Sequence, residues 1–222
     1  MLYFRGCTAR EKDKKIADAT ESLLKLLDVD YFTLLNEQCC GSVLLRTGFT
    51  DEAQEQISKN LELFGDETIL TSCAGCYKTF KEDYPDLDVI HISQLLANLI
   101  KEGKFKLNNN NLNVTYHDPC HLARHCGEFE ASREVIKASS NLIEMDNIKD
   151  KAVCCGAGGG VKSAYPKIAE NLANSRLDEA SKTGAEILIT SCPFCKLNLN
   201  NKKMEVLDLT EFLIKYGDID ER

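Results

Sequence analysis

Cysteine is the residue type that could do most chemistry in this sequence, with 11 cysteines among 222 residues. Ten of them form two sets with the same order: a single cysteine, an adjacent pair followed by glycine, and a Cys-x-x-Cys motif. Thiolates are soft ligands, so each set predicts a site for zinc, copper(I), or iron with sulfide. The first set is Cys7, Cys39, Cys40, Cys73 and Cys76, and the second is Cys120, Cys154, Cys155, Cys192 and Cys195.

The alternative use of many cysteines is a framework of disulfides in a secreted protein. The chain begins MLYFRGCTAREKDKK, which lacks the charged-then-apolar order of a secretion signal. We therefore expect a cytoplasmic protein, whose thiols stay reduced. A chain of this length also has enough core to fold without disulfide staples. Metal binding is thus favoured over disulfides.

Charge and hydropathy exclude two classes of partner. Lysine and arginine number 27 against 35 aspartates and glutamates, which gives a net charge of −8. An acidic protein is poorly suited to non-specific binding of nucleic acid or anionic lipid. The apolar runs are too short for a helix that spans a membrane. We expect neither a nucleic-acid partner nor a direct membrane span.

Each Cys-x-x-Cys motif follows a predicted buried strand. Residues 67–76 read ETILTSCAGC and residues 186–195 read EILITSCPFC, both with β-branched runs that end in Thr-Ser-Cys. Shorter strands are expected at residues 2–4 and 114–117, just before the first cysteine of each set. A further matched pair, DVIHISQLLANLI from residue 88 and EVLDLTEFLIKYG from residue 205, predicts a strand that runs into a helix.

Helices are predicted between the cysteine motifs. Thr50 is a candidate N-cap, with Asp51 and Glu52 in the first turn. Pro166 suits the first turn of another helix. Apolar side chains recur at helical spacing in three segments: Ala53, Ile57, Leu61 and Phe64; Ile168, Leu172 and Leu177; and Ile16, Leu23, Leu24 and Leu27.

Alternating strands and helices predict an α/β fold with mostly parallel sheets. The internal repeat predicts two similar α/β halves, residues 1–107 and 112–222, related by a pseudo-twofold and divided by a turn or short linker of four asparagines. Sites in such sheets form at the carboxyl ends of the strands, where the three cysteine segments of each half would meet. The glycine of each Cys-Cys-Gly supplies the torsions a wrapped site needs, whereas the run at 156–160 could also be only a tight loop.

The number of thiols constrains the kind of metal site. Structural zinc and an ordinary cubane iron–sulfur cluster each take four ligands, one fewer than each set offers. The fifth thiol is then a reactive group, a bridging ligand or a bystander, and its presence in both sets disfavours the bystander. The spacing by itself leaves the type of cluster open.

In these motifs the chain resembles the cysteine-rich CCG domain proteins. That family includes the B and D subunits of heterodisulfide reductases, thiol:fumarate reductase, and iron–sulfur subunits of glycolate, lactate and glycerol-3-phosphate oxidising systems. The resemblance covers essentially the whole chain. It is strongest in the second half, at YHDPCHLARHCG, CCGAGGGV and TSCPFC, whereas the interval of 32 residues between Cys40 and Cys73 is shorter than is usual in the family.

The resemblance implies that each set of five cysteines holds a non-cubane [4Fe-4S] cluster. In heterodisulfide reductases the two clusters face one another and cleave a disulfide between them, each supplying one electron and capturing one sulfur. The fifth cysteine helps to bridge the open cluster. Some quinone-linked relatives look to hold zinc at one site, so zinc remains an alternative for one site of this chain.

Several residues outside the ten cysteines are weighed for a role. His121, directly after Cys120, is the best candidate for a catalytic proton donor. Arg124 could attract an anionic substrate, but a surface arginine is as good an interpretation. Cys126 is unmatched in the first half and is expected to be a small buried side chain. His91 is expected to be a loop residue, with Asp208 at the corresponding place.

The sequence lacks both the cysteine runs of ferredoxin-type clusters and a dinucleotide-binding glycine motif after a strand. We therefore expect a partner that delivers or removes electrons, either a ferredoxin-type subunit or a flavoprotein. The favoured hypothesis is an iron–sulfur oxidoreductase subunit of heterodisulfide reductase type, acting on a small-molecule thiol or disulfide.

Two other hypotheses remain. In one, the chain only relays electrons, as a subunit of a flavin-dependent glycolate, lactate or glycerol-3-phosphate dehydrogenase or of a thiol:fumarate reductase. In the other, it is a zinc-stabilised binding module, which is disfavoured because tetrahedral zinc takes four ligands and each set offers five thiols.

Overall fold

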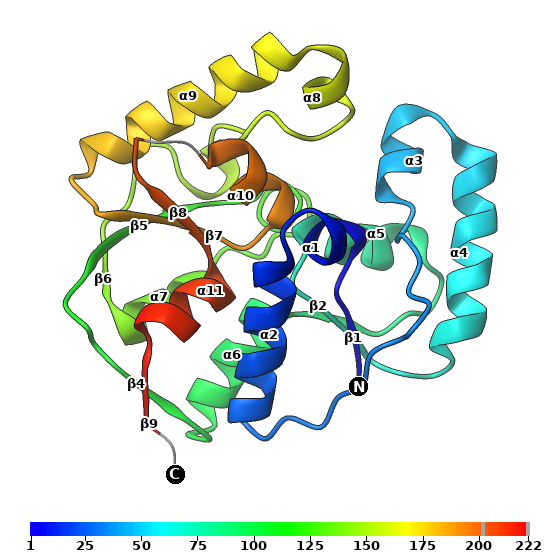
Figure 1. Ribbon diagram of the computed structural model, residues 1–222, viewed down its shortest axis with the longest axis horizontal. Helices are drawn as coiled ribbons and strands as arrows, with labels where there is room; N and C mark the ends of the chain where they lie inside the picture. The colour runs from blue at the N-terminus through cyan, green and yellow to red at the C-terminus, as the bar shows by residue number, and fades with distance from the viewer. Residues whose placement is uncertain (201–202, 221–222) are drawn as a thin grey trace.

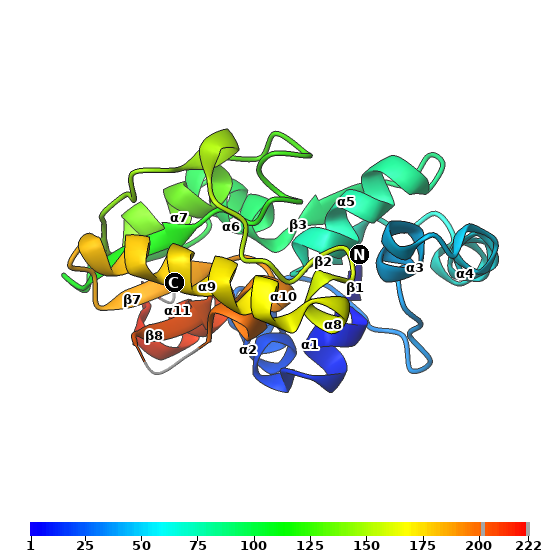
Figure 2. The same ribbon diagram turned by 90° about the horizontal axis from the view of Figure 1, so that it is seen from above.

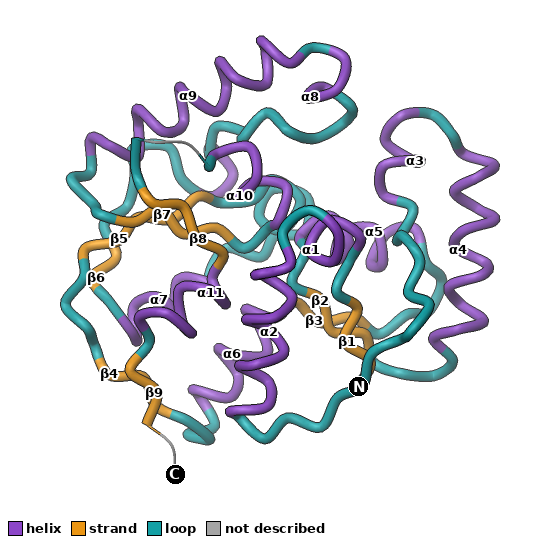
Figure 3. The backbone as a smooth tube through the Cα atoms, in the orientation of Figure 1, coloured by secondary structure: helices purple, strands orange, loops and turns teal. Residues whose placement is uncertain are grey.

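The computed structural model describes residues 1–200 and 203–220 of the chain. Four residues of the second expected half, 201–202 and 221–222, lie outside the described residues. Two parallel sheets lie near the middle of the molecule, with helices around them (Figures 1 and 3). This arrangement confirms the mixed α/β class with mostly parallel sheets.

The first sheet has the strand order β1-β2-β3 and is parallel throughout. Its strands are β1 (Leu2–Phe4), β2 (Ile69–Thr71) and β3 (Val89–His91). Every residue of β1 and β2 is buried, as expected for a parallel sheet that is covered on both faces. The central strand, β2, ends two residues before Cys73.

The second sheet has the order β6-β5-β7-β8 and is also parallel. Its strands are β5 (Asn113–His117), β6 (Asn141–Leu142), β7 (Ile187–Thr190) and β8 (Glu205–Asp208). Here β7 ends two residues before Cys192. The strands expected before the first cysteine of each set and before each Cys-x-x-Cys are therefore present.

One small sheet is antiparallel. β4 (Lys106–Asn108) pairs with β9 (Asp218–Asp220), which joins the middle of the chain to its far end. The asparagine tract predicted as a turn or linker thus starts inside a strand. Its next two members make ordered contacts: Asn110 donates from its side chain to the Tyr216 carbonyl at 2.9 Å, and the Asn109 side chain accepts from the Asn111 backbone at 2.7 Å.

The helices alternate with the strands as the sequence predicts. Figure 2 shows α9 and α8 along one side of the molecule and α3 and α4 at one end. Their bounds are α1 (Cys7–Glu11), α2 (Lys14–Leu26), α3 (Ser42–Thr47), α4 (Thr50–Phe64), α5 (Ala74–Asp83), α6 (Ile92–Lys101), α7 (Ala131–Ser139), α8 (Val161–Ala164), α9 (Pro166–Lys182), α10 (Pro193–Leu199) and α11 (Leu209–Tyr216), with a 3-10 turn at Lys149–Lys151. Within the described residues no helix combines the length and apolarity that a membrane crossing requires.

The largest core cluster draws on both expected halves. α2 packs on α11, and α6 packs on α7. The cluster joins Leu23 and Leu96 from the first half to Val135 and Phe212 from the second. The division into halves at residues 107 and 112 and the pseudo-twofold between them stay predictions.

Three local predictions need correction. Thr50 is the first residue of α4 rather than its cap, because the chain leaves α3 at the left-handed Gly48 and places Phe49 at the N-cap. Ile168 is exposed, although Leu177 of the same predicted stripe is buried, because the rest of the buried face of α9 consists of alanines and Arg176. His91 is not in a loop: it ends β3 and caps α6, accepting a hydrogen bond from the Ser93 backbone.

Candidate metal centre

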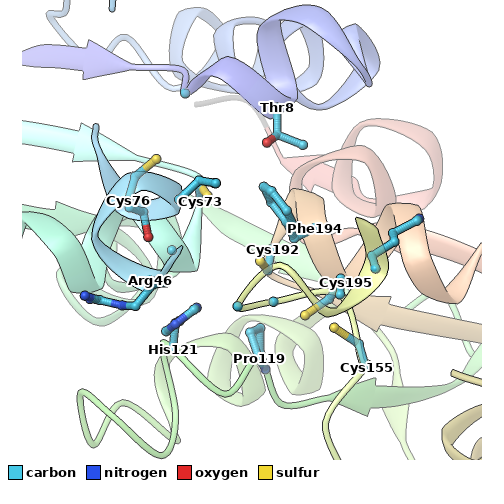
Figure 4. Close-up of a pocket in the computed structure, with 18 of the residues that line it drawn as sticks. Thr8, Arg46, Cys73, Cys76, Pro119, His121, Cys155, Cys192, Phe194 and Cys195 are labelled. Carbon is cyan, nitrogen blue, oxygen red and sulfur yellow. The ribbon is translucent and has the colours of Figure 1, made fainter. Parts of the chain in front are cut away.

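All ten cysteines of the two sets line a single cavity of about 240 Å³. It lies where the carboxyl ends of the strands in both sheets meet. Figure 4 shows Cys73 and Cys76 on one side of the cavity, Cys155, Cys192 and Cys195 on the other, and His121 along the edge between them. The cysteines that are far apart in sequence therefore come together in two facing groups.

Strand ends and helix starts fix the Cys-x-x-Cys motifs. Cys73 is the N-cap of α5 and Cys192 is the N-cap of α10, while Cys76 and Cys195 lie in the first turns. The partial positive charge at a helix N-terminus stabilises thiolates. Both motifs are buried, so their sulfurs point into the protein rather than into bulk water.

Within each group the sulfurs lie against one another. Cys7 Sγ lies 3.7 Å from Cys39 Sγ. Hydrogen bonds from neighbouring thiols lower the pKa of one sulfur in the first group and two in the second: Cys39 donates to Cys40, Cys120 to Cys154, and Cys195 to Cys192. The two groups also meet directly, because the Cys73 thiol donates to Cys192, which raises the pKa of Cys73.

Glu37 holds the loop that carries Cys7. Its buried carboxylate accepts the backbone N–H of Arg5 at 3.0 Å and of Gly6 at 2.9 Å. Arg10 donates to the Glu37 backbone carbonyl, next to the Cys39–Cys40 pair. Burial raises the pKa of Glu37, and the two backbone N–H groups oppose that rise. One buried acid thus joins two of the three cysteine segments of the first group.

Buried amides hold the adjacent cysteine pairs. Asn60 donates to the Cys39 carbonyl at 2.8 Å and to the Tyr84 hydroxyl at 2.7 Å, and that hydroxyl donates to the Cys40 carbonyl at 3.1 Å. In the second group Asn198 donates to the Cys155 carbonyl at 2.6 Å. These hydrogen bonds hold the backbone carbonyls of the cysteine pairs, and so they fix the backbone from which the cysteine side chains reach the cavity.

Two glycines allow the chain to pass close to the sulfurs. Gly6 has φ of 82°, and a Cβ there would lie 3.2 Å from Cys76 Sγ. Gly156, which follows the second cysteine pair, has φ of 86°, and a Cβ there would lie 2.8 Å from the Ala169 carbonyl oxygen. Both positions lie in the left-handed region that favours glycine. The expected role of glycine after Cys-Cys is confirmed at Gly156.

A family model described as "CCG: Cysteine-rich domain" matches residues 1–81 and 114–200. These two segments contain all ten cysteines of the cavity. The chain belongs to the cysteine-rich CCG family.

Relatives of this CCG chain carry names of redox enzymes. It is 43% identical to the D subunit of a dihydromethanophenazine:CoB–CoM heterodisulfide reductase from Methanosarcina acetivorans, over 90% of this chain and 53% of that one. It is 36% identical to the B subunit of a fumarate reductase (CoM/CoB) from Methanothermobacter marburgensis, over 97% of this chain and 46% of that one. It is 33% identical to an EtfAB:quinone oxidoreductase from Syntrophomonas wolfei, over 87% of this chain and 30% of that one.

The CCG chain spans about half the length of the first two relatives. What it has in common with them is the cysteine-rich domain of proteins named as reductases and oxidoreductases.

Of the other candidates from sequence, only His121 lines the cavity. Its ring is half-buried, burial lowers its pKa, and it lies 5.3 Å from the exposed ring of His125. Arg124 is exposed and donates to the Ala152 carbonyl at 2.6 Å, outside the cavity lining. Cys126 is half-buried, packs on the core of the second sheet, and is likewise not part of the lining.

Some cavity residues were missed by sequence reasoning. Arg46 from α3 lines the cavity and forms an ion pair with Asp83 at 3.2 Å. Lys162 from α8, the helix that follows the second Cys-Cys-Gly segment, also lines the cavity. Phe194, which in the second Cys-x-x-Cys takes the position that Gly75 has in the first, also lines the cavity. The sequence could have indicated Arg46 and Lys162 as cavity residues, since each follows a Cys-Cys-Gly segment by a few residues.

A ring nitrogen of His117 and the sulfurs of Cys155 and Cys195 lie within 4.8 Å of one another. His117 ends β5 as predicted and is fully buried. Burial lowers the pKa of His117 to about 4, with a further contribution from Arg176, so its imidazole is neutral. The sequence placed His117 only at the end of an expected strand.

The donor set suits iron and sulfide. Each group gathers five soft sulfurs with a mostly buried, apolar surrounding. Thiolates crowded together repel one another, and only a bound cationic centre allows more than one or two to ionise in each group. A single zinc ion would leave a fifth sulfur over. The residues therefore fit a larger thiolate-bound centre in each group.

Proposed function

We propose that this chain is an iron–sulfur oxidoreductase subunit of heterodisulfide reductase type. It would reduce or form a disulfide of small thiols at two non-cubane [4Fe-4S] clusters. The observation that carries the proposal is the single cavity lined by both complete cysteine sets, in which Cys73 and Cys192 neighbour one another. Two redox sites that open to one cavity suit a substrate with two sulfurs, since each site can serve one of them.

The cysteines are assigned by group. Cys7, Cys39, Cys40, Cys73 and Cys76 would hold one cluster, and Cys120, Cys154, Cys155, Cys192 and Cys195 the other. When bound, the clusters would supply one electron each to the disulfide and bind its separated sulfurs. The protein's own part is to hold five sulfurs per group in place through the Glu37, Asn60 and Asn198 contacts described above.

Reduction of a disulfide breaks one S–S bond, takes two electrons and two protons, and releases two thiols. The electrons would come from a partner redox subunit. His121 is assigned as the residue that gives a proton to a departing thiolate, because its ring reaches the cavity between the two groups. His125 beside it is exposed and would exchange protons with water.

The electron partner is proposed from the cysteine motifs of this chain and from the names of its relatives. This chain offers two cysteine groups inside one cavity, and its sequence lacks a ferredoxin-type motif. Two of its relatives are named as subunits of reductases, and a subunit works within an assembly. A ferredoxin-type subunit or a flavoprotein would therefore exchange electrons with it.

The test starts from protein purified without oxygen. Iron, sulfide and zinc are measured, and electron paramagnetic resonance spectra are recorded with and without an added thiol. The protein is then reduced, heterodisulfide is added, and free thiols are counted. The Cys126→Ser variant is the matched control, because Cys126 lies outside the cavity lining.

We expect iron and sulfide in both groups, a spectrum that changes when thiol is added, and thiol release by the wild type and the control. Stoichiometric zinc with little iron would overturn the two-cluster assignment. Iron without thiol release from any disulfide, combined with rapid reoxidation by a flavoprotein, would favour the electron-relay function instead.

A further inference from the structure

The two cysteine groups differ in the residue that ends the strand beside them. In the second sheet His117 pairs in register with Thr190, the threonine of Thr-Ser-Cys. In the first sheet the equivalent Thr71 pairs with Phe4 on the corresponding side and with His91 on the other side. The side chains of His117 and Phe4 are both fully buried. One group therefore has a polar ring where the other has a hydrocarbon ring.

Arg176 decides which ring nitrogen of His117 carries the proton. Arg176 Nε donates to His117 Nδ1 at 3.1 Å, and an arginine N–H can only donate. Nδ1 must therefore be the accepting nitrogen, which places the proton of the neutral ring on Nε2. Glu179 and the Asn147 carbonyl hold Arg176 in turn, at 2.7 and 2.8 Å.

His117 Nε2 is buried and has no hydrogen-bond partner among the residues that the structure describes. A buried donor without a partner is unfavourable, because its hydrogen bond to water has been lost and not replaced. The sulfurs of Cys155 and Cys195 are nearby groups of suitable chemistry, because they lie within 4.8 Å of a ring nitrogen of His117. A thiolate or cluster sulfur at that place would accept the proton.

We propose that His117 Nε2–H donates a hydrogen bond to a sulfur of the second group, and so makes the second centre easier to reduce than the first. This inference rests on the proposed iron–sulfur function. His117 acts here as a positioning and tuning residue and not as a ligand, because ligation through Nε2 would need a lone pair that the Arg176 contact assigns to Nδ1.

The direction of the effect follows from charge. A hydrogen bond to a ligand sulfur withdraws negative charge and stabilises the reduced, more negative form of the centre, which raises its reduction potential. The buried guanidinium of Arg176, one residue further from the sulfurs, acts in the same direction. Phe4 offers the first group no donor at the corresponding place, and His91, the other neighbour of Thr71, is not part of the cluster of candidate metal-binding atoms found among the described residues. An electron that enters the protein would therefore settle in the second group.

The experiment compares two substitutions in the full-length, cluster-loaded chain. His117→Phe gives the second group the ring that the first group already has, and His117→Gln keeps a side-chain N–H. Phe4→Leu is the matched control in the first group. Iron content is measured first, and then a redox titration followed by electron paramagnetic resonance gives the midpoint of each centre. Cys7→Ser identifies the signal of the first group.

We expect His117→Phe to retain iron and to lower the midpoint potential of the second centre only. The midpoint of His117→Gln should lie between those of His117→Phe and the wild type, and Phe4→Leu should leave the midpoint of the second centre unchanged. Pulsed resonance with ¹⁵N-labelled histidine should show a weak nitrogen coupling that His117→Phe removes. Loss of iron from both His117 variants, or a strong coupling, would make His117 a ligand and overturn the inference. Unchanged midpoints with iron retained would also overturn it, whereas protein without iron would contradict the proposed function itself.

Discussion

At the scale of single residues, the environment gives similar side chains different roles. The histidines show this plainly: His91 caps a helix, His117 is buried against the second cysteine group, and His121 reaches the cavity. Cys126 differs from the other thiols in the same way, since it alone lies outside the cavity lining. Burial and neighbours, rather than residue type, separate these roles.

His121→Gln should lower turnover in disulfide reduction by roughly 10²–10⁴-fold, the usual contribution of a general acid. Iron content should stay at the wild-type level, because His121 is not among the proposed ligands. The comparison is with His125→Gln, whose ring lies 5.3 Å away but is exposed. Equal turnover in His121→Gln and wild type would refute the role.

Gly6→Ala should reduce the iron content of the first group. The substitution forces a side chain into φ of 82° and places a Cβ 3.2 Å from Cys76 Sγ. Gly103→Ala is the matched control, since Gly103 has φ of 67° and nothing within 4 Å of the added carbon. Metal analysis of both variants checks this, and equal iron loss in the two would show that backbone strain alone is responsible.

At the scale of elements, the same device ends a strand and starts a helix in both sheets. His91 ends β3 and caps α6, while Asp208 ends β8 and caps α11, each within a capping box. Such a box satisfies two backbone N–H groups at the helix start. Because each cap follows an edge strand of its sheet directly, it fixes where the helix packs on the shared core.

Asp208 should make stability depend on pH. Burial raises the pKa of Asp208 to about 8, whereas an unfolded aspartate has a pKa of about 3.9. Between these values the folded state holds a proton that the unfolded state has lost, so the free energy of unfolding falls as pH rises from about 4 to about 8.

Asp208→Asn keeps an oxygen for the Thr210 backbone N–H and should remove this part of the pH dependence. Urea unfolding without oxygen at several pH values measures the change, with the exposed Asp66→Asn as control. Identical slopes for Asp208→Asn and wild type over that range would contradict the assignment.

At the scale of the whole molecule, a buried ion pair joins segments from both ends of the chain. Lys196 in α10 contacts Asp13, just before α2, at 2.7 Å and Glu211 in α11 at 2.6 Å. These side chains are 7, 13 and 9% exposed. The contact lies between the helix that carries Cys195 and the segment that follows the helix of Cys7. It therefore links the supports of the two cysteine groups.

Lys196→Met should lower the free energy of unfolding by about 3–5 kcal/mol, because it leaves the buried carboxylate of Glu211 and the partly buried carboxylate of Asp13 without their cation. Lys215→Met, which breaks an exposed pair with Glu205, should lower the free energy of unfolding far less, because water screens exposed charges. Anaerobic urea unfolding of both variants measures the difference. Similar losses in the two would show that the Lys196 cluster is no more stabilising than a surface pair.

Sequence patterns alone were enough to predict the strand before each Cys-x-x-Cys, the α/β class, and the membership of ten cysteines in two sets. It could do so because strand and helix patterns are local, and because strand ends in parallel sheets meet at one edge. It also singled out His121 by its place directly after Cys120. It misplaced the start of α4 and the buried face of α9, where the tight turn at Gly48 and the burial of Arg176 overrode local pattern.

The folded structure was needed to show that both cysteine sets open to one cavity, that Arg46 and Lys162 line it, and that Arg124 does not. The pairing of Arg176 with His117 was equally hidden, since 59 positions separate the two residues in the chain. The physical reason is that contacts between distant segments depend on how α2, α6, α7 and α11 pack around a shared core. That packing balances many small terms at once and leaves no local signature in the sequence.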